Sequence, residues 1–132
     1  MIPQPYVIAF QHFSSPEKGA ITIAENGVQL PFDVKRTYWV YDNLPGSVRG
    51  NHAHVYSEQV LVAMHGSVRI VLENLDGEIK EFVLNGAQEG LYIPPMYWRT
   101  IYLDEDSVCL SFSSHAYEEG DYIRDKAEFI KK

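Results

Sequence analysis

Cysteine, long apolar runs and positive charge are all scarce in this chain. The single cysteine, Cys109, excludes an internal disulfide, and its segment, Ser107 to Phe112, is typical of a buried strand rather than of a nucleophile. No apolar run approaches the roughly 20 residues of a membrane-spanning helix. Because there is also no signal-peptide pattern at the N-terminus, we expect a cytoplasmic protein.

The charge balance excludes one large class of partners. With 18 acidic residues against 11 basic ones, the net charge is -7, and a nucleic-acid groove would need a basic surface instead. An anionic ligand could still bind where a few arginines gather. Apolar residues make up 45% of the 132 residues, which excludes disorder, and the length predicts one domain over residues 1–132.

What the chain does have is a series of short, strand-like segments with turn signals between them. Such spacing, with almost no helix-like periodicity, indicates a sandwich or barrel. A loop and a short helix are expected only in the tail, at 117–129. The expected strands are 6–10, 19–24, 29–32, 36–41, 49–54, 58–64, 67–72, 79–84, 91–93, 97–103 and 108–112.

The most informative stretch contains His52, His54 and Glu58. Side chains alternate along a strand, so two histidines two residues apart point to one face. Glu58 follows after a short turn, where a second strand begins. All three groups could therefore point into one cavity of a small barrel, although an exposed strand with two surface histidines is the simpler alternative.

This histidine pattern resembles the first motif of the cupins, which are double-stranded β-helix (jelly-roll) barrels. Gly46, His52, His54 and Glu58 fit that motif, and Gly66 arrives one residue late. The resemblance implies an all-β fold with a short C-terminal helix.

The second cupin motif departs from the usual pattern, and the departure bears on metal binding. Pro94 fits, but Met96 stands at the glycine position and Arg99 at the position of the histidine that completes the metal site in metallocupins. A guanidinium has no lone pair and repels a second cation. His52, His54 and Glu58 remain as a chemically possible three-ligand set. Without a metal, the imidazoles are free to move protons.

Several further segments resemble one family, the dTDP-4-keto-6-deoxyglucose 3,4-ketoisomerases, which are WxcM-like sugar-isomerase cupins. The resemblance covers about residues 31–129. It rests on the segments RTYW (36–39), RGNHAH (49–54), GLYIPPMYWR (90–99) and YEEGDYIR (117–124).

The resemblance implies a cofactor-free and metal-free isomerase that moves the ketone of a dTDP-4-keto-6-deoxyhexose from C4 to C3 through an enediolate. The 3-keto products of such enzymes lead to 3-amino sugars in bacterial surface glycans such as lipopolysaccharide O-antigen. It also implies a homodimer in which an N-terminal strand is exchanged between subunits.

The family's motifs assign catalytic roles to three residues. His52 matches the base, and His54 beside it would orient the site or relay a proton. Tyr38 matches a tyrosine near the sugar hydroxyls, where it could donate to the oxyanion or shuttle a proton between O3 and O4. A structural role in the barrel wall is the alternative for Tyr38.

Three more residues are candidates for substrate binding. Arg99 could stabilise the enediolate or hold a phosphoryl oxygen, and Arg49 could bind the diphosphate. Glu58 could set the tautomer of His54 or accept from a sugar hydroxyl. By resemblance, arginine at position 99 also implies that the product keeps the gluco configuration at C4.

Other functions remain open at this point. A metal-free 3,5-epimerase on the same substrate would pair its histidine base with an aspartate, and no aspartate stands out near His52. A metal-dependent cupin oxygenase would use the residual ligand set. A non-catalytic sugar-binding module would bind the nucleotide sugar without turning it over.

Overall fold

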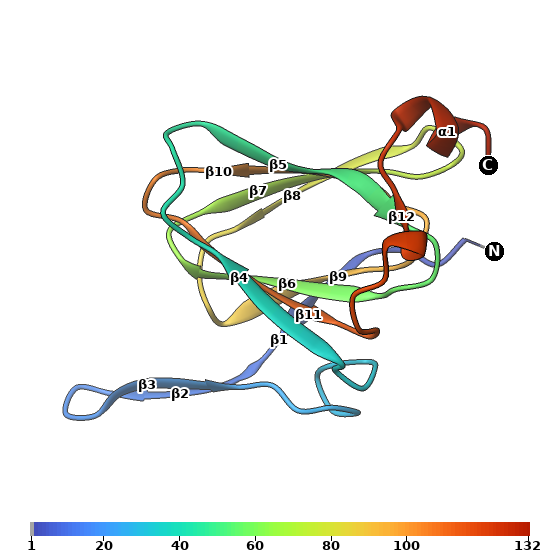
Figure 1. Ribbon diagram of the computed structural model, residues 1–132. Helices are drawn as coiled ribbons and strands as arrows, with labels where there is room; N and C mark the ends of the chain where they lie inside the picture. Colours follow the sequence, from blue (N-terminus) through green and yellow to red (C-terminus); the bar gives the residue numbers. More distant parts are fainter. Residues whose placement is uncertain (1) are drawn as a thin grey trace.

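Two five-stranded antiparallel sheets face each other in the computed structural model, which describes residues 2–132 (Figure 1). In the order of pairing, the first sheet contains β1 (Tyr6–Ala9), β9 (Glu89–Ile93), β6 (Gln59–His65), β11 (Val108–Ser113) and β4 (Arg36–Val40). The second contains β12 (Tyr122–Ile123), β5 (Ser47–His54), β10 (Trp98–Leu103), β7 (Val68–Glu73) and β8 (Ile79–Leu84). This is the all-β cupin jelly roll expected from the sequence, and the short C-terminal helix, α1 (Lys126–Ile130), is confirmed.

Alternating side chains explain why the two sheets face each other. In β7, Val68, Ile70 and Leu72 are buried between the sheets, while the residues between them are partly exposed. Burying one such side chain stabilises the fold by about 1.5–3 kcal/mol. The interior between the sheets is therefore an apolar core, which also includes Leu61, Leu91 and Leu103.

A second apolar cluster covers the outer face of the first sheet. Ile8 and Phe10 from the N-terminal segment and Leu30 from the loop before β4 pack on Val60 and Val62 of β6. The chain near residue 30 is not the strand that the sequence predicted for 29–32. It forms a turn with a single isolated bridge between Asn26 and Leu30, because its apolar side chains serve as a cover for the sheet.

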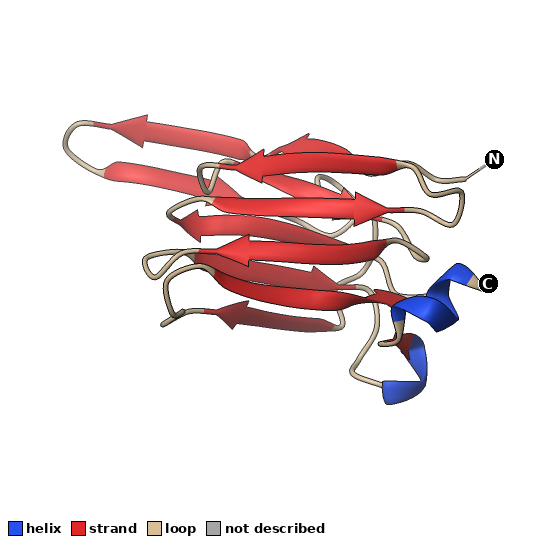
Figure 2. Cartoon of the chain, turned by 90° about the horizontal axis from the view of Figure 1, so that it is seen from above, coloured by secondary structure: helices blue, strands red, loops and turns tan. Residues whose placement is uncertain are grey.

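The hairpin formed by β2 (Gln11–Ser15) and β3 (Gly19–Ile23) projects away from the two sheets (Figures 1 and 2). The sequence predicted β3, but it predicted a break around Ser14 to Pro16 where β2 ends. The predicted break does mark the turn between β2 and β3, but the sequence did not predict β2.

A bulge in β5 brings the predicted histidines into position. Gly50 and Asn51 adopt positive φ angles of 87° and 51°, and the pairing of β5 with β10 shifts register between Arg99 and Thr100. A Cβ atom at Gly50 would lie 2.8 Å from the carbonyl oxygen of Arg99, so glycine is needed for this close approach. The bulge sets His52 directly opposite Arg99.

The C-terminal segment closes one end of the barrel. A 3-10 turn, η1 (Glu119–Asp121), leads into β12, which pairs with the end of β5, and α1 then packs Phe129 against Trp98. The sequence predicted a loop and a helix here but missed β12, whose two residues are too few to show a period. Within residues 2–132, no helix is long and apolar enough to cross a membrane.

Candidate active site

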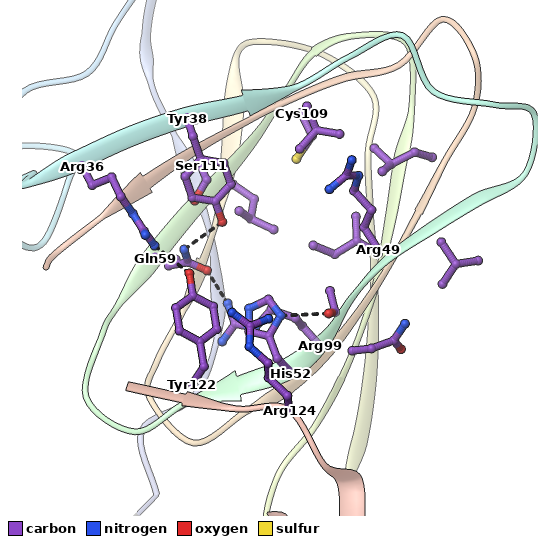
Figure 3. A pocket seen from close by; sticks show the side chains of 17 residues that line it. Arg36, Tyr38, Arg49, His52, Gln59, Arg99, Cys109, Ser111, Tyr122 and Arg124 are labelled. Carbon is purple, nitrogen blue, oxygen red and sulfur yellow. Dashed lines mark hydrogen bonds between the residues drawn. The ribbon is translucent and has the colours of Figure 1, made fainter. Parts of the chain in front are cut away.

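A cavity of about 560 Å³ lies between the two sheets and extends along β4 and β5, from Val40 and Val48 to Tyr122 and Arg124 of the C-terminal segment (Figure 3). Its deeper wall is apolar and includes Leu61, Ile101 and Cys109. Burial raises the pKa of the Cys109 thiol to about 12, which confirms a core residue rather than a nucleophile. The polar lining residues are Arg36, Tyr38, Arg49, Asn51, His52, Gln59, Arg99, Ser111, Tyr122 and Arg124.

His52 presents a free ring nitrogen in this cavity. Its Nδ1 lies 2.9 Å from the carbonyl oxygen of Gly50, and since a carbonyl only accepts, Nδ1 carries the proton. The lone pair is therefore on Nε2, which is buried and has no hydrogen-bond partner among the described residues. Burial, reinforced by the charge of Arg99, lowers the pKa of His52 to about 4. The imidazole is thus neutral at neutral pH, and its lone pair on Nε2 is available to accept a proton.

His54 lies behind His52 and is completely buried. The two rings stand edge to face with centroids 4.9 Å apart, and the cavity lining includes His52 but not His54. Burial, then the charges of Arg99 and His52, lower the pKa of His54 to about 3. The alternation expected from the sequence is confirmed, because Ala53 between them packs on the opposite face with Trp98.

Asp121 holds His54 in place. Its Oδ2 accepts from Nδ1 of His54 at 2.8 Å, and its Oδ1 accepts from the backbone N–H groups of Tyr56 at 2.8 Å and Ser57 at 3.3 Å. Burial raises the pKa of Asp121, but the hydrogen bonds from Ser57, Tyr56 and His54 outweigh it, so the net shift is downward. The carboxylate stays charged and fixes the ring orientation of His54.

Glu58 does not take the role that the sequence suggested. The hypothesis that it sets the tautomer of His54 is wrong, because Asp121 does so. The Glu58 carboxylate instead accepts from the hydroxyl of Tyr92 at 2.6 Å, and Glu58 is not among the residues that line the cavity. The chain turns before β6 begins, and Gln59, one residue later, occupies the inward position.

The Arg99 guanidinium is buried in the cavity wall, and only 1% of the residue is exposed. Nη1 donates to Oε1 of Gln59 at 2.5 Å and Nη2 to the carbonyl oxygen of Tyr97 at 3.2 Å, while Nε has no partner among the described residues. None of the ion pairs among residues 2–132 involves Arg99. Burial lowers its pKa to about 10, so it remains a cation at neutral pH.

Tyr38 and Arg49 also line the cavity, as predicted. Along β4, Tyr38 and Val40 point into the cavity, while Trp39 between them is exposed. Arg49 lies at an exposed position of β5. Together with Arg36 and Arg99, it makes the cavity locally basic in an acidic chain, whereas Arg124 is paired with Glu119 at 2.9 Å.

Sequence reasoning missed two functional candidates in the tail. Tyr122 packs its ring 5.0 Å from His52 and 4.5 Å from His54, and its hydroxyl accepts from Nη2 of Arg36 at 3.0 Å (Figure 3). Asp121 precedes it and lies 67 positions from its partner His54. The segment YEEGDYIR was noted only as part of a resemblance, which was the available signal for both residues.

The residues at this site do not suit a divalent metal. Residues 2–132 contain no group of three or more His, Cys, Asp or Glu side chains able to hold an ion. Glu58, the third candidate ligand, is bound to Tyr92, and the Arg99 cation lies beside the imidazoles. The donor set that metallocupins use is therefore broken at two positions.

The facing sheets and the histidine-lined cavity define a cupin-type protein. The chain belongs to the FdtA family, WxcM-like, C-terminal, whose family model matches residues 4–132.

Individual relatives agree with this family. The chain is 37% identical over 116 residues to TDP-4-oxo-6-deoxy-alpha-D-glucose-3,4-oxoisomerase from Aneurinibacillus thermoaerophilus, covering 86% of this chain and 82% of that one. It also resembles the sugar 3,4-ketoisomerase QdtA from Thermoanaerobacterium thermosaccharolyticum in complex with TDP, with 36% identity, a TM-score of 0.92 and coverage of 99% and 95%. A His-to-Asn mutant of QdtA, in complex with TDP-4-keto-6-deoxyglucose, matches with 35% identity, a TM-score of 0.92 and coverage of 99% and 94%.

The buried neutral histidines predict that the protein loses stability in mild acid. The histidine pKa is about 6.5 in the unfolded chain but about 4 for folded His52 and about 3 for folded His54. The unfolded state therefore binds more protons below pH 6.5. The free energy of unfolding should be highest above pH 6.5, where the histidines are neutral in both states. It should fall by roughly 2 kcal/mol per histidine between pH 7 and pH 5.

Urea unfolding at pH 7, 6 and 5 measures this fall. Replacing His52 by Gln should reduce the pH dependence, and the same change at His65, which is exposed, should leave it unaltered. A free energy of unfolding that stays constant from pH 7 to pH 5 would contradict the neutral, buried state of both rings.

Proposed function

We propose that this protein is a 3,4-ketoisomerase that moves the ketone of a dTDP-4-keto-6-deoxyhexose from C4 to C3. The observation that carries the proposal is the neutral His52, with its unpartnered Nε2, in a cavity that also contains an Arg99 cation without a carboxylate partner among the described residues. A base without a positive charge and a fixed cation are the two groups that enolisation requires. Two of the relatives are named TDP-4-oxo-6-deoxy-alpha-D-glucose-3,4-oxoisomerase and sugar 3,4-ketoisomerase.

The reaction begins with proton removal from carbon. The ketone at C4 acidifies the hydrogen at C3, and Nε2 of His52 takes that proton as the C3–H bond breaks. The electron pair moves into a C3–C4 double bond and the former carbonyl oxygen becomes an oxyanion. Arg99 stabilises the enediolate because its charge is desolvated and already in position.

The second half returns the proton to the neighbouring carbon. The hydroxyl of Tyr38 accepts the proton of O3 and delivers one to O4, so that the carbonyl re-forms at C3. His52 then gives its proton to C4. One proton has moved from C3 to C4 and one from O3 to O4, and no electron acceptor is needed. His54, held by Asp121, packs against His52 and keeps its ring in place.

Local positive charge supports a nucleotide-linked substrate. Arg36, Arg49 and Arg124 line the cavity together with Arg99, although the chain as a whole carries a net charge of -7. A basic cavity in an acidic protein attracts an anion selectively to that site. We assign Arg49 to the diphosphate. A cytoplasmic location, a single domain over residues 1–132 and a role in surface-glycan synthesis stay predictions.

The experiment that tests this function is an NMR time course with dTDP-4-keto-6-deoxyglucose. The parent protein should move the carbonyl to C3, whereas an epimerase would leave it at C4 and a binding module would show no turnover. The same spectra report the configuration at C4, for which arginine at position 99 predicts gluco.

His52→Asn should abolish turnover, by at least about a hundredfold, because general base catalysis contributes 10²–10⁴-fold. Binding of the nucleotide sugar, measured by calorimetry, should survive because the amide fits the same space. His65→Asn is the matched control, since His65 is exposed on β6 and outside the cavity, and it should retain parental activity. A His52→Asn protein that keeps more than a tenth of the parental rate would rule out this base.

We also propose that the protein is a homodimer held together by its N-terminal segment. Phe13 and Ile21 face each other across the β2–β3 hairpin and are 54% and 58% exposed. An isolated two-stranded hairpin is marginally stable in water, so this one needs a partner surface. We propose that this hairpin is the exchanged element; β1 itself pairs with β9 of its own chain.

Light scattering after size-exclusion chromatography should give twice the monomer mass of 15.1 kDa. Replacing both Phe13 and Ile21 by Asp should shift the protein to the monomer, because a charge cannot be buried unpaired in an apolar interface. A parent protein that elutes as a monomer at micromolar concentration would sink the dimer proposal but leave the isomerase proposal untouched.

A further inference from the structure

Gln59 occupies a central place in the cavity that the mechanism above does not use. It is the first residue of β6, only 1% of it is exposed, and it lies between Arg99 and Tyr38 (Figure 3). Its Oε1 accepts from Nη1 of Arg99 at 2.5 Å. Its Nε2 donates to the hydroxyl oxygen of Tyr38 at 3.2 Å and to Oγ of Ser113 at 2.8 Å. One amide thus connects the buried cation to the proposed proton shuttle.

Chemistry fixes the orientation of this amide. A guanidinium has only donors, so the group that faces Arg99 must be the oxygen of Gln59. The NH₂ group is therefore directed at Tyr38 and Ser113, whose oxygens can both accept. The amide is buried and makes its hydrogen bonds inside the protein. If it flipped, its NH₂ group would face Arg99, which is also a donor, so the observed orientation is fixed.

This orientation determines what the Tyr38 hydroxyl can do. Its oxygen accepts from Gln59, so its own hydrogen is not used in that bond. Since Tyr38 lines the cavity, the hydrogen is left to point at whatever the cavity holds. The charge of Arg99 polarises the amide, and the polarised N–H in turn favours negative charge on the tyrosine oxygen. Both effects suit a hydroxyl that must give up and regain a proton.

We propose that Gln59 is a positioning residue that fixes Tyr38 as a hydrogen donor toward the substrate oxygens and transmits the charge of Arg99 to it. The proposal rests on the isomerase function, in which Tyr38 moves a proton between O3 and O4. Gln59 acts through Tyr38.

Gln59→Glu reverses the polarity at nearly constant shape. A carboxylate can only accept, so it pairs with Arg99 and takes the hydrogen of Tyr38, which then no longer faces the substrate. We expect kcat to fall at least tenfold, KM to change less than about threefold, and the urea midpoint to stay at or above that of the parent. Gln88→Glu adds the same charge at an exposed position and should change none of these values.

Removing the Tyr38 hydroxyl separates positioning from a merely structural role. In a Tyr38→Phe background, Gln59→Met should lower kcat less than threefold, because the hydroxyl that Gln59 acts on is already absent. Met is used for this comparison because it removes the donor without adding a carboxylate, which would pair with Arg99 and lower kcat with or without Tyr38.

Two outcomes would overturn the proposal: an unchanged kcat in Gln59→Glu, or an equal loss of kcat on Gln59→Met in the parent and Tyr38→Phe backgrounds. A parent protein without turnover would instead refute the isomerase function, so the two failures are distinguishable.

Discussion

The buried guanidinium of Arg99 opposite His52 is the interaction on which the rest of the site depends. Burying an ion costs several kcal/mol, and here two hydrogen bonds to neutral groups offset that cost without a carboxylate. Three properties of the site follow from this positive charge. Burial, reinforced by this cation, keeps both imidazoles neutral; the cation also works against a second cation such as a metal and stabilises an oxyanion that forms in the cavity. A buried charge that shifts the pKa of its neighbours in a cavity is typical of an active site.

The fold delivers this arrangement through two local features. The bulge at Gly50 turns the carbonyl oxygen of that residue onto Nδ1 of His52 and so leaves Nε2 free for the substrate. The C-terminal segment then returns to the end of β5, where β12 pairs with His54 and Ala53 and brings Asp121 under the second ring. The C-terminal segment also buries Ile123 and Phe129 with Ala53 and Trp98, so the segment that positions Asp121 is held in place by apolar contacts of its own.

Sequence reasoning succeeded where the relevant pattern is local. The common face of His52 and His54 follows from a strand period of two, and the arginine in place of a metal-ligating histidine is read from a few adjacent residues. It failed where the partner is distant or the element is short. Asp121 finds His54 across 67 positions, and β12 has too few residues to show a period. Glu58 was favoured over Gln59 because a carboxylate is a conspicuous ligand, yet the turn before β6 places the amide inside. The prediction of a strand at 29–32 was wrong because a loop whose apolar residues cover a sheet has the same apolar pattern as a short strand.

Direct observation of the ring nitrogens tests the central claim that His52 is a neutral base with its lone pair on Nε2. In protein labelled with ¹⁵N at histidine, we expect the His52 ring to show a protonated Nδ1 and an unprotonated Nε2 from pH 7 to pH 5, and to gain a second proton only near pH 4. A His52 ring that titrates near pH 6.5, or one that carries its proton on Nε2 at neutral pH, would contradict the claim.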